Sequence, residues 1–536
     1  MSIPVTPFMW LTAFLPILLL LVLMIGFHWG ATDAAPIGVA AAVVTGVLLY
    51  KADLGLIAIE SAKGIWNALV ILLIVWTAVL LYQVGNEANA FLAIRNGMKR
   101  LLPNELLLLL ALGWIFESFL QGITGFGVPV AVGAPLLIGI GVKPLWAVII
   151  PLLGQSWGNT YGTLGAAWDA LAMSAGLSAG EAEYFLTALY AAALLWLWNL
   201  LIGLVTCWFY GRGRAVKKGL PAVLLLSGIQ GGGELVLSQF NPTLACFVPA
   251  CVSLAAILLL GKSSLYGTKW RIEDSAVMKR ESQKDTGKEA PQTTDMTFLH
   301  ALLPYVLLSV ITLAVLLITP VRQLLSRVSI GPSFPKTVTG YGFVNEASDY
   351  FSPLSPFTHA SMFLFVSSMA GLAFYTKRGW IAPGGVERVF KKSLFMTLPS
   401  GIAVIGLVIM SKIMAGTGQT AVLADGIARV LGKGYVFLAP FIGMLGSFMT
   451  GSNMSSNILF GSFQMTTAGI LRVRFACVLA SQTAGGSIGS AISPSNIVLG
   501  TTTADILGRE GEVLKRMSAV VLPTAFAMGI VVFFCI

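Results

Sequence analysis

Charged residues are scarce in this chain: only 10% of its 536 residues are Asp, Glu, Lys or Arg, while 56% are hydrophobic. A globular protein of this length carries about a quarter charged residues to keep its surface in water. The shortage therefore excludes a water-soluble protein and indicates that most of the surface faces lipid. The formal net charge of +10 is spread in short clusters between apolar stretches, which predicts membrane orientation and not nucleic-acid binding.

Residues that ligate metals or carry out catalysis are equally scarce. The five cysteines lie in apolar segments without metal-ligand spacing, and the three histidines are isolated. This pattern gives no sign of a disulfide framework or a metal site. A membrane enzyme would need a nucleophile, a base or a metal set near a cytoplasmic face, and none is found. We therefore predict that the chain is not an enzyme and has no cofactor.

Apolar stretches long enough to cross a bilayer run along the whole chain. A hydrocarbon core of about 30 Å needs about 20 apolar residues per helix. By that measure we predict an all-α polytopic membrane protein with 12 to 14 transmembrane helices. The first stretch has no basic start and no persuasive cleavage site, so we expect a retained helix and not a signal peptide. The candidate spans are 9–29, 34–50, 65–85, 105–120, 144–160, 184–210, 219–239, 243–261, 298–320, 357–375, 394–414, 435–450, 473–490 and 513–536.

Two stretches interrupt the series of spans. Residues 262–297 are rich in charge and cannot bury enough apolar area to fold alone, so we expect a mobile cytoplasmic loop. Residues 321–356 mix Pro, Gly, Ser and aromatics, which indicates an ordered extramembrane loop. The predicted organisation is N-terminal scaffold helices (1–64), a first repeat (65–210), connecting helices (211–261), the polar loop (262–297), scaffold helices with an extracytoplasmic loop (298–393), a second repeat (394–512) and a C-terminal helix (513–536).

The two predicted repeats rest on internal similarity. Residues 85–122 align without gaps with 414–451, and QSWGNTYGT (155–163) aligns with QTAGGSIGS (482–490). Coincidence in a glycine-rich chain is the alternative explanation, but ordered matches in two separate blocks favour a repeat. Because cytoplasmic loops are enriched in Lys and Arg, placing the basic clusters inside makes the repeats run in opposite directions. Inverted repeats are the architecture of many secondary transporters.

Each repeat contains a stretch at membrane depth where small or polar residues interrupt the apolar run. These are QGITGFGVPVAVGAPLLIGIGVKP (121–144) and TGSNMSSNILFGSFQ (450–464). Unwound backbone at that depth needs protein or a water-filled cavity around it, so we predict re-entrant hairpins near 121–144 and 450–472 that line a site. Helix N-termini there would offer free N–H groups and positive dipole ends to an anion. Close helix packing explains a single Ser or Gly, but not six hydrogen-bonding side chains between 450 and 457.

The candidate site combines these hairpins with the polar residues of the second repeated block. Glu117 stands one turn before the first hairpin, and we predict a role in proton coupling because a carboxylate in a membrane is costly unless paired, hydrated or protonated. A helix-end Glu that reaches headgroup water is the alternative. Asp169, Glu234 and Lys412 lie near span ends, where solvated or paired states are expected. The predicted substrate-binding residues are Gln121, Gly122, Thr124, Gly125, Gln155, Asn159, Thr160, Thr450, Ser452, Asn453, Ser455, Ser456, Asn457, Gln482, Thr483, Ser487, Ser490 and Ser493.

At these residues the chain resembles the lactate permease family. The most specific pieces are GFGVPVAVGAPLLIGIGVKPLWA (125–147), TGSNMSSNILF (450–460) and TAGGSIGSAISPSNIVLG (483–500), followed by GREGEVLKR (508–516). The resemblance covers most of the chain. It implies an inner-membrane permease that carries L-lactate or glycolate inward by proton symport. It also implies an elevator movement of two hairpins, a scaffold that can form a homodimer, and no prosthetic group.

The chain departs from the family's usual pattern at three positions. Gln121 and Asn453 stand where an acidic residue is usual, and Ser490 stands where a lysine is usual. Two alternatives therefore stay open. A sodium-coupled carrier of a different carboxylate or other organic anion could hold Na⁺ with unwound carbonyls and Ser or Asn oxygens. An anion channel would share the polar hairpins without alternating access.

Overall fold

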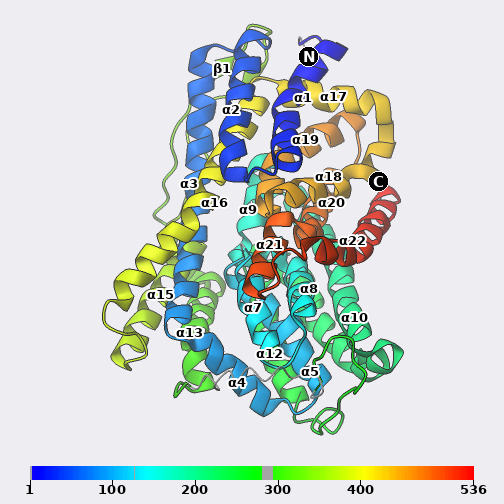
Figure 1. Cartoon of the computed structure of the whole chain (residues 1–536). Coiled ribbons are helices and arrows are strands. Elements are labelled where there is room, and N and C mark those ends of the chain that lie inside the picture. The colour runs from blue at the N-terminus through cyan, green and yellow to red at the C-terminus, as the bar shows by residue number, and fades with distance from the viewer. Residues whose placement is uncertain (1–2, 126, 281–293, 536) are drawn as a thin grey trace.

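The computed structural model describes residues 3–125, 127–280 and 294–535. Within these ranges the chain is helical apart from loops and one small antiparallel pair of strands, β1 (Thr337–Val338) and β2 (Val344–Asn345). Figure 1 shows two bodies of helices side by side. The body that contains the two interrupted stretches is called the core here. The body built on the long helices α3 (Leu54–Glu87) and α16 (Gly385–Gly416), which pack against each other, is called the scaffold.

Eleven helices in the described part of the chain are long and apolar enough to cross a membrane. Our prediction of 12 to 14 is higher than this count. Two of the predicted spans, 184–210 and 219–239, fall in one helical stretch, Ala182–Leu237, which enters this count once although its backbone leaves the helical range between them, at Gly211 and Arg212. Another, 144–160, is mostly α8 (Pro144–Ser156), whose 13 residues are too few to cross a bilayer. Hydropathy alone locates apolar stretches but does not show how long each helix is.

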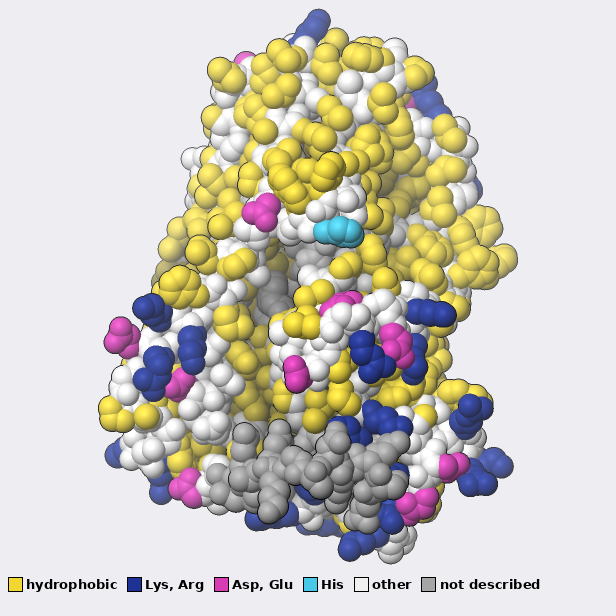
Figure 2. Space-filling view, in the orientation of Figure 1, with side chains coloured by type: hydrophobic (Ala, Val, Ile, Leu, Met, Phe, Trp, Pro, Cys, Tyr) yellow, Lys and Arg dark blue, Asp and Glu magenta, His cyan; other side chains and the backbone are white. Residues whose placement is uncertain are grey.

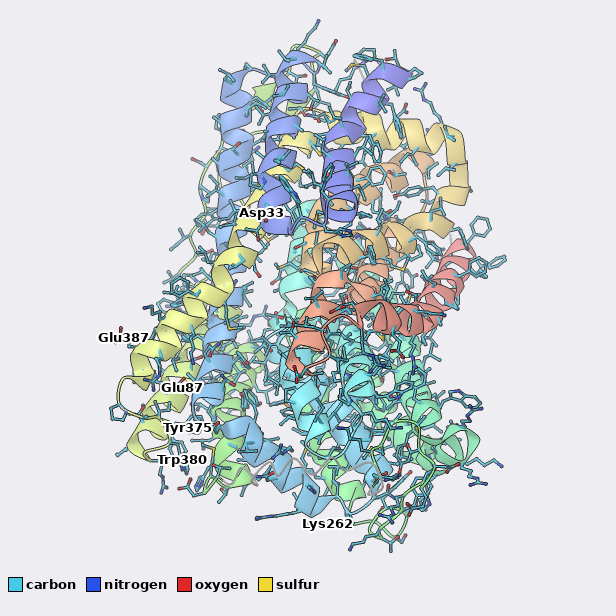
Figure 3. All side chains as sticks on the ribbon, viewed as in Figure 1. Asp33, Glu87, Lys262, Tyr375, Trp380 and Glu387 are labelled. Atoms are coloured by element: carbon cyan, nitrogen blue, oxygen red, sulfur yellow. The ribbon has the colours of Figure 1, made fainter. Side chains whose placement is uncertain are left out.

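The scaffold packs further helices along α3 and α16. Among them, α2 lies against α16 and α15 lies against α3. Glu87 at the end of α3 is 2.8 Å from Arg388 and 3.3 Å from Lys392 on α16, which fixes the two helices at one end (Figure 3). The other scaffold and neighbouring helices are α1 (Pro7–Leu21), α2 (Ala31–Leu48), α4 (Ala90–Leu101), α13 (Phe298–Leu317), α14 (Thr319–Leu325), α15 (Ala360–Lys377) and α17 (Gln419–Leu431).

Two helical stretches of the core are surrounded almost completely by protein. The apolar window in Glu105–Ile123 is 100% buried and that in Phe475–Thr503 is 94% buried, whereas the window in the scaffold helix α13 is only 28% buried. Such burial lets small and polar residues occupy positions that lipid would not tolerate. The core helices are α5 (Glu105–Leu110), α6 (Phe116–Ile123), α7 (Val128–Ile138), α8, α9 (Gly162–Ala175), α10 (Ala182–Ser227), α11 (Gly233–Leu237), α12 (Phe247–Leu260), α18 (Tyr435–Thr450), α19 (Asn453–Leu471), α20 (Phe475–Gly489), α21 (Pro494–Thr503) and α22 (Glu510–Phe533).

The two interrupted stretches form helical hairpins. The first hairpin consists of α6 and α7, and the second of α18 and α19. Glycines with positive φ angles make the turns: Gly125 (61°) and Gly127 (77°) in the first hairpin, Gly451 (74°) in the second. Only glycine adopts such angles without steric cost, so the helices end there.

The two segments predicted as extramembrane loops, 262–297 and 321–356, compare differently with their predictions. Residues 321–356 are ordered as predicted, because β1 and β2 continue into bridges between Ile330 and Leu354 and between Phe334 and Ser348. The expectation of a free loop is wrong for 262–280, which packs on the core with Ile272, Val277 and Met278 buried. Its backbone also bonds the end of the first hairpin, from Lys143 N to Val277 O (2.8 Å). The part of the predicted loop at 281–293 lies outside the described residues.

Candidate functional site

A small cavity lies where the two hairpin tips meet two broken helices. Its volume is about 30 Å³, less than a small carboxylic acid needs, so a ligand of that size requires the cavity to widen. Residues of α6 to α9 form one side and residues of α18 to α21 form the other. The lining residues are Gln121, Gly125, Gly127, Gln155, Asn159, Gly162, Thr163, Ala166, Ala167, Gly451, Ser452, Asn453, Met454, Ser490 and Asn496.

The broken helices bring unwound backbone to the cavity. Between α8 and the body of α9, the residues Thr163, Leu164 and Gly165 have φ angles of 51°, 49° and 86°, outside the right-handed helical range. Between α20 and α21, a short 3₁₀ turn at Ser490–Ile492 is followed by Ser493 in an extended conformation. Thr163 at the first break and Ser490 at the second line the cavity.

Four helices begin at the cavity. α7 starts after Gly127, α19 after Ser452 and α21 after Ser493, and the regular part of α9 follows Gly165. N-termini carry unpaired N–H groups and a partial positive charge. Among the described lining residues there is no Lys, Arg, His, Asp or Glu. Attraction for an anion at this site therefore comes from helix ends and neutral amides and hydroxyls.

A hydrogen-bond network centred on Asn453 ties the second hairpin to both broken helices. The Asn453 amide donates to the hydroxyls of Thr160 (3.1 Å) and Thr483 (3.2 Å), which are 3.0 Å from each other. Asn457 also donates to Thr483, at 2.9 Å. Asn159 donates to the Ser490 hydroxyl at 2.5 Å. The network fixes the polar groups next to the cavity without using any charge.

The predicted site residues divide into those that line the cavity and those that do not. Gln121, Gly125, Gln155, Asn159, Ser452, Asn453 and Ser490 line it, and Thr160, Asn457 and Thr483 form the network behind it. Ser456 and Gln482 bond each other at 3.1 Å between α19 and α20, and Ser487 donates to Ser156 O at 2.7 Å. The remaining predicted residues, Gly122, Thr124, Thr450, Ser455 and Ser493, also lie off the cavity.

Eight of the lining residues are absent from the predicted substrate-binding residues, although Asn496 belongs to a segment for which the sequence favours a role in the site. Gly127 and Gly451 are turn glycines of hairpins that we did predict, and Asn496 lies in the SPSN segment (493–496). Gly162 and Thr163 belong to the repeated block at 155–163, which was therefore the signal that could have found them. Ala166, Ala167 and Met454 carry no chemical signal, and only the fold places them there.

Glu117 lies on α6 behind Gln121, one helical turn from the cavity. Its side chain is fully buried, and neither carboxyl oxygen has a hydrogen-bond partner among the described residues. The carboxyl packs against Gly133 of α7, where any larger residue would overlap it. The alternative of a helix-end Glu that reaches headgroup water is therefore wrong for this structure.

Glu234 needs a similar correction, because we expected a solvated or paired group at a span end. It is fully buried at the start of α11, and both carboxyl oxygens lack partners among the described residues. Lys412 instead donates to the Met173 carbonyl at 3.4 Å, which links α16 of the scaffold to α9 of the core. Hydropathy patterns did not distinguish the buried site of Glu234 from the site of Lys412, which bonds a carbonyl.

Three amide oxygens close to the cavity are buried without a donor in the described part of the chain: Gln155 Oε1, Asn453 Oδ1 and Asn457 Oδ1. Buried acceptors without a partner are uncommon and call for an explanation such as an ion or a water. No group of three or more His, Cys, Asp or Glu that could hold a metal occurs within the described residues.

Comparison with known proteins places the chain among permeases. A family model described as L-lactate permease matches residues 9–536. The chain is 28% identical to the L-lactate permease of Salmonella typhi over 535 residues, which cover 94% of this chain and 92% of that protein. It is 26% identical to the glycolate permease GlcA of Escherichia coli (strain K12) over 555 residues, covering 97% and 94%. A solved structure of the YdaH transporter of Alcanivorax borkumensis aligns with 87% of this chain and 84% of that one, at 11% identity and a TM-score of 0.42.

Proposed function

The chain belongs to the L-lactate permease family, and from that premise we propose that it is a secondary active carrier that takes up a small monocarboxylate of the L-lactate or glycolate class across a bacterial inner membrane. Its relatives are permeases, and eleven of its helices can span a bilayer. The chain is therefore a multi-pass membrane transport protein and not an enzyme. The single observation that carries the substrate class is the cavity lined by helix N-termini, amides and hydroxyls with no charged side chain in its described lining.

The chemistry of the cavity suits one carboxylate on a small molecule. The helix N-termini and the Asn and Gln amides provide donors for the carboxylate oxygens. The serine and threonine hydroxyls can both donate to and accept from a substrate hydroxyl. A second carboxylate would lie in this cavity without a cationic side chain in the described lining to compensate its charge, which is unfavourable. The proposal is thus a carrier of monocarboxylates in preference to dicarboxylates.

Proton symport is the proposed coupling, with Glu117 as the residue that binds the proton. A carboxyl buried without a partner is far less costly when it is neutral than when it is ionised. Movement that exposes Glu117 to water on one side would allow it to release the proton there. Glu117 lies one helical turn behind Gln121, which lines the cavity. The protonation of Glu117 can therefore depend on whether a substrate occupies the cavity.

Inverted repeats and an elevator movement complete the proposal. The aligned segments include α4 in the first half and α17 in the second, and Figure 1 places these two helices at opposite ends of the molecule. Most Lys and Arg side chains on the face in Figure 2 lie in its lower part, which favours a cytoplasmic lower end. The core holds both hairpins as one buried unit that can slide along the scaffold.

Cysteine labelling tests this topology. Lys99 on α4 and Lys433 after α17 are both exposed, and the exposed native Cys535 would first be replaced by Ser. We expect Lys433→Cys to react with a membrane-impermeant maleimide in intact cells and Lys99→Cys to react only after lysis. Reaction of both from the same side would contradict the inverted arrangement.

Uptake into proteoliposomes tests the function itself. The purified full chain would be reconstituted and given an imposed proton gradient, sodium gradient or no gradient, with L-lactate, glycolate and a set of dicarboxylates. We expect saturable accumulation of the monocarboxylates driven by protons. Uptake that does not saturate would contradict a carrier, and preference for a dicarboxylate would contradict the proposed substrate class.

A sodium-coupled carrier of a different carboxylate is the second candidate. It is favoured by the three partnerless amide oxygens of Gln155, Asn453 and Asn457, because neutral oxygens of this kind can coordinate Na⁺. The same assay separates the two, since accumulation driven by sodium alone would replace the proton proposal.

A further inference from the structure

A second, much larger cavity lies away from the hairpins, where α10 breaks. Its volume is about 660 Å³, and it is enclosed by the start of α8, the break in α10 and the segment at 272–276. Its lining combines two cationic side chains, one carboxylate and several aromatic rings: Arg212, Arg214, Asp274, Trp146, Trp208 and Phe209. None of these residues belongs to the candidate substrate site.

The break in α10 presents two arginines at the mouth of this cavity. Gly211 (φ −166°) and Arg212 (φ 49°, ψ −141°) leave the helical range and interrupt a helix of 46 residues. Arg212 and Arg214 are both exposed, and neither has a hydrogen-bond or ion-pair partner among the described residues. Arginine geometry fits phosphate oxygens in pairs, so two unpaired guanidinium groups at one cavity favour a phosphate-bearing ligand.

Aromatic rings next to the arginines indicate the level of the membrane interface. Trp208 is 54% exposed and lies three residues before Gly211, where the break in α10 begins. Inside the cavity wall, the rings of Trp146 and Phe209 are 4.7 Å apart, and the Arg516 guanidinium lies 4.9 Å from the centre of the Trp146 ring. Tryptophan is enriched at the height of lipid headgroups, with Lys and Arg beside it on the cytoplasmic side.

We propose that this cavity binds the headgroup of an anionic phospholipid from the cytoplasmic leaflet. The phosphate would contact Arg212 and Arg214, and the glycerol and upper acyl chains would lie against Trp208 on the lipid-facing side of α10. Basic pockets between helices on the cytoplasmic side are suited to such headgroups. A free phosphate would be attracted to the arginines in the same way, but it has no apolar part that could contact the exposed Trp208. The site is independent of which substrate the carrier moves.

Lipid retention by the full chain tests the proposal. The wild type, Arg214→Gln and the double variant Arg212→Gly/Arg214→Gln would be purified from vesicles with equal phosphatidylglycerol and phosphatidylethanolamine. Gly at position 212 keeps the positive φ angle without strain. Native mass spectrometry would count the lipids that remain bound. We expect retention of phosphatidylglycerol to fall about fivefold for each arginine removed, while phosphatidylethanolamine is unchanged.

The matched control is Lys99→Gln/Lys217→Gln, which removes two exposed positive charges that do not line the cavity. Arg214→Gln changes an exposed residue on a regular helix, so we expect this variant to fold. Its retention of phosphatidylglycerol can therefore be measured even if the double variant does not fold. Equal loss of phosphatidylglycerol in the control, or no loss in Arg214→Gln, would overturn the proposal. Thermal stabilisation by inorganic phosphate as large as that by phosphatidylglycerol would also overturn it, in favour of a free phosphate ligand.

Discussion

The two hairpins occupy equivalent places beside the cavity, yet they differ in chemistry. The first turns through glycines and carries Glu117, a buried carboxyl without a partner in the described structure. The second carries no ionisable group at its tip, and its Asn453 amide is held by the hydroxyls of Thr160 and Thr483. The difference indicates that the second hairpin organises the binding groups, while the first holds the group that can change its charge. Variants of each hairpin should therefore fail in different ways.

Asn453→Ala should have the largest effect on transport. The change removes both hydrogen bonds to the threonine hydroxyls and a polar group that lines the cavity. Loss of a donor in a buried site costs about 1–3 kcal/mol, so we expect the apparent KM to rise about five- to hundredfold or uptake to cease. Initial uptake rates in proteoliposomes, corrected for the amount of protein, measure this.

Asn86→Ala on the scaffold is the matched control, because Asn86 is exposed and remote from the cavity. It should transport as the wild type does. Wild-type KM in Asn453→Ala would remove Asn453 from the binding site.

Gly451→Ala should have the next largest effect. A methyl group there would lie 2.3 Å from the Ser495 hydroxyl oxygen, and φ at this residue is +74°. A left-handed alanine costs about 1–2 kcal/mol before the overlap is counted, so we expect roughly tenfold slower uptake from a displaced second hairpin. Uptake rates in proteoliposomes again give the result.

Gly508→Ala provides the comparison for Gly451→Ala. Its φ is +91°, but a methyl group there would meet no atom within 4 Å, and the residue is not at the cavity. If both variants slow uptake equally, backbone strain in general and not the fit of the second hairpin is responsible.

Ser456→Ala should have the smallest effect on transport. Ser456 donates to Gly443 O at 2.7 Å and accepts from Gln482 at 3.1 Å, but it does not line the cavity. We expect the free energy of unfolding to fall by about 1 kcal/mol, with KM unchanged. Thermal unfolding in detergent and uptake kinetics measure the two quantities, and Ser326→Ala, on an exposed turn, is the control. A raised KM with normal stability would place Ser456 in the binding site.

The sequence predicted the helical class and the positions of both hairpins because Gly, Pro, Ser and Asn are conspicuous in an apolar chain. It also found the polar residues that line the cavity, such as Asn159 and Asn453. It could not separate Asn453 from Ser456, which are three residues apart on one helix. Their roles differ because Asn453 lines the cavity, whereas Ser456 bonds Gly443 of α18 and Gln482 of α20 away from it. This difference depends on how α19 is rotated in the packed core.

Other features depend on tertiary packing that composition does not reveal. Glu234 and Lys412 look alike as charges near span ends, but one is buried without a described partner and the other bonds a carbonyl of the core. Segment 262–280 is polar enough to remain in water, yet Ile272, Val277 and Met278 find apolar surface on the core. Predicting these outcomes requires knowledge of which surfaces are adjacent.

Glu117→Gln gives the most direct test of the central claim, that the first hairpin couples uptake to protons. The amide has nearly the same shape but cannot bind and release a proton. In proteoliposomes, substrate exchange without a gradient needs no net proton movement, whereas accumulation against a gradient does. We predict that Glu117→Gln keeps exchange and loses proton-driven accumulation. Accumulation by Glu117→Gln with the same dependence on pH as the wild type would contradict the account.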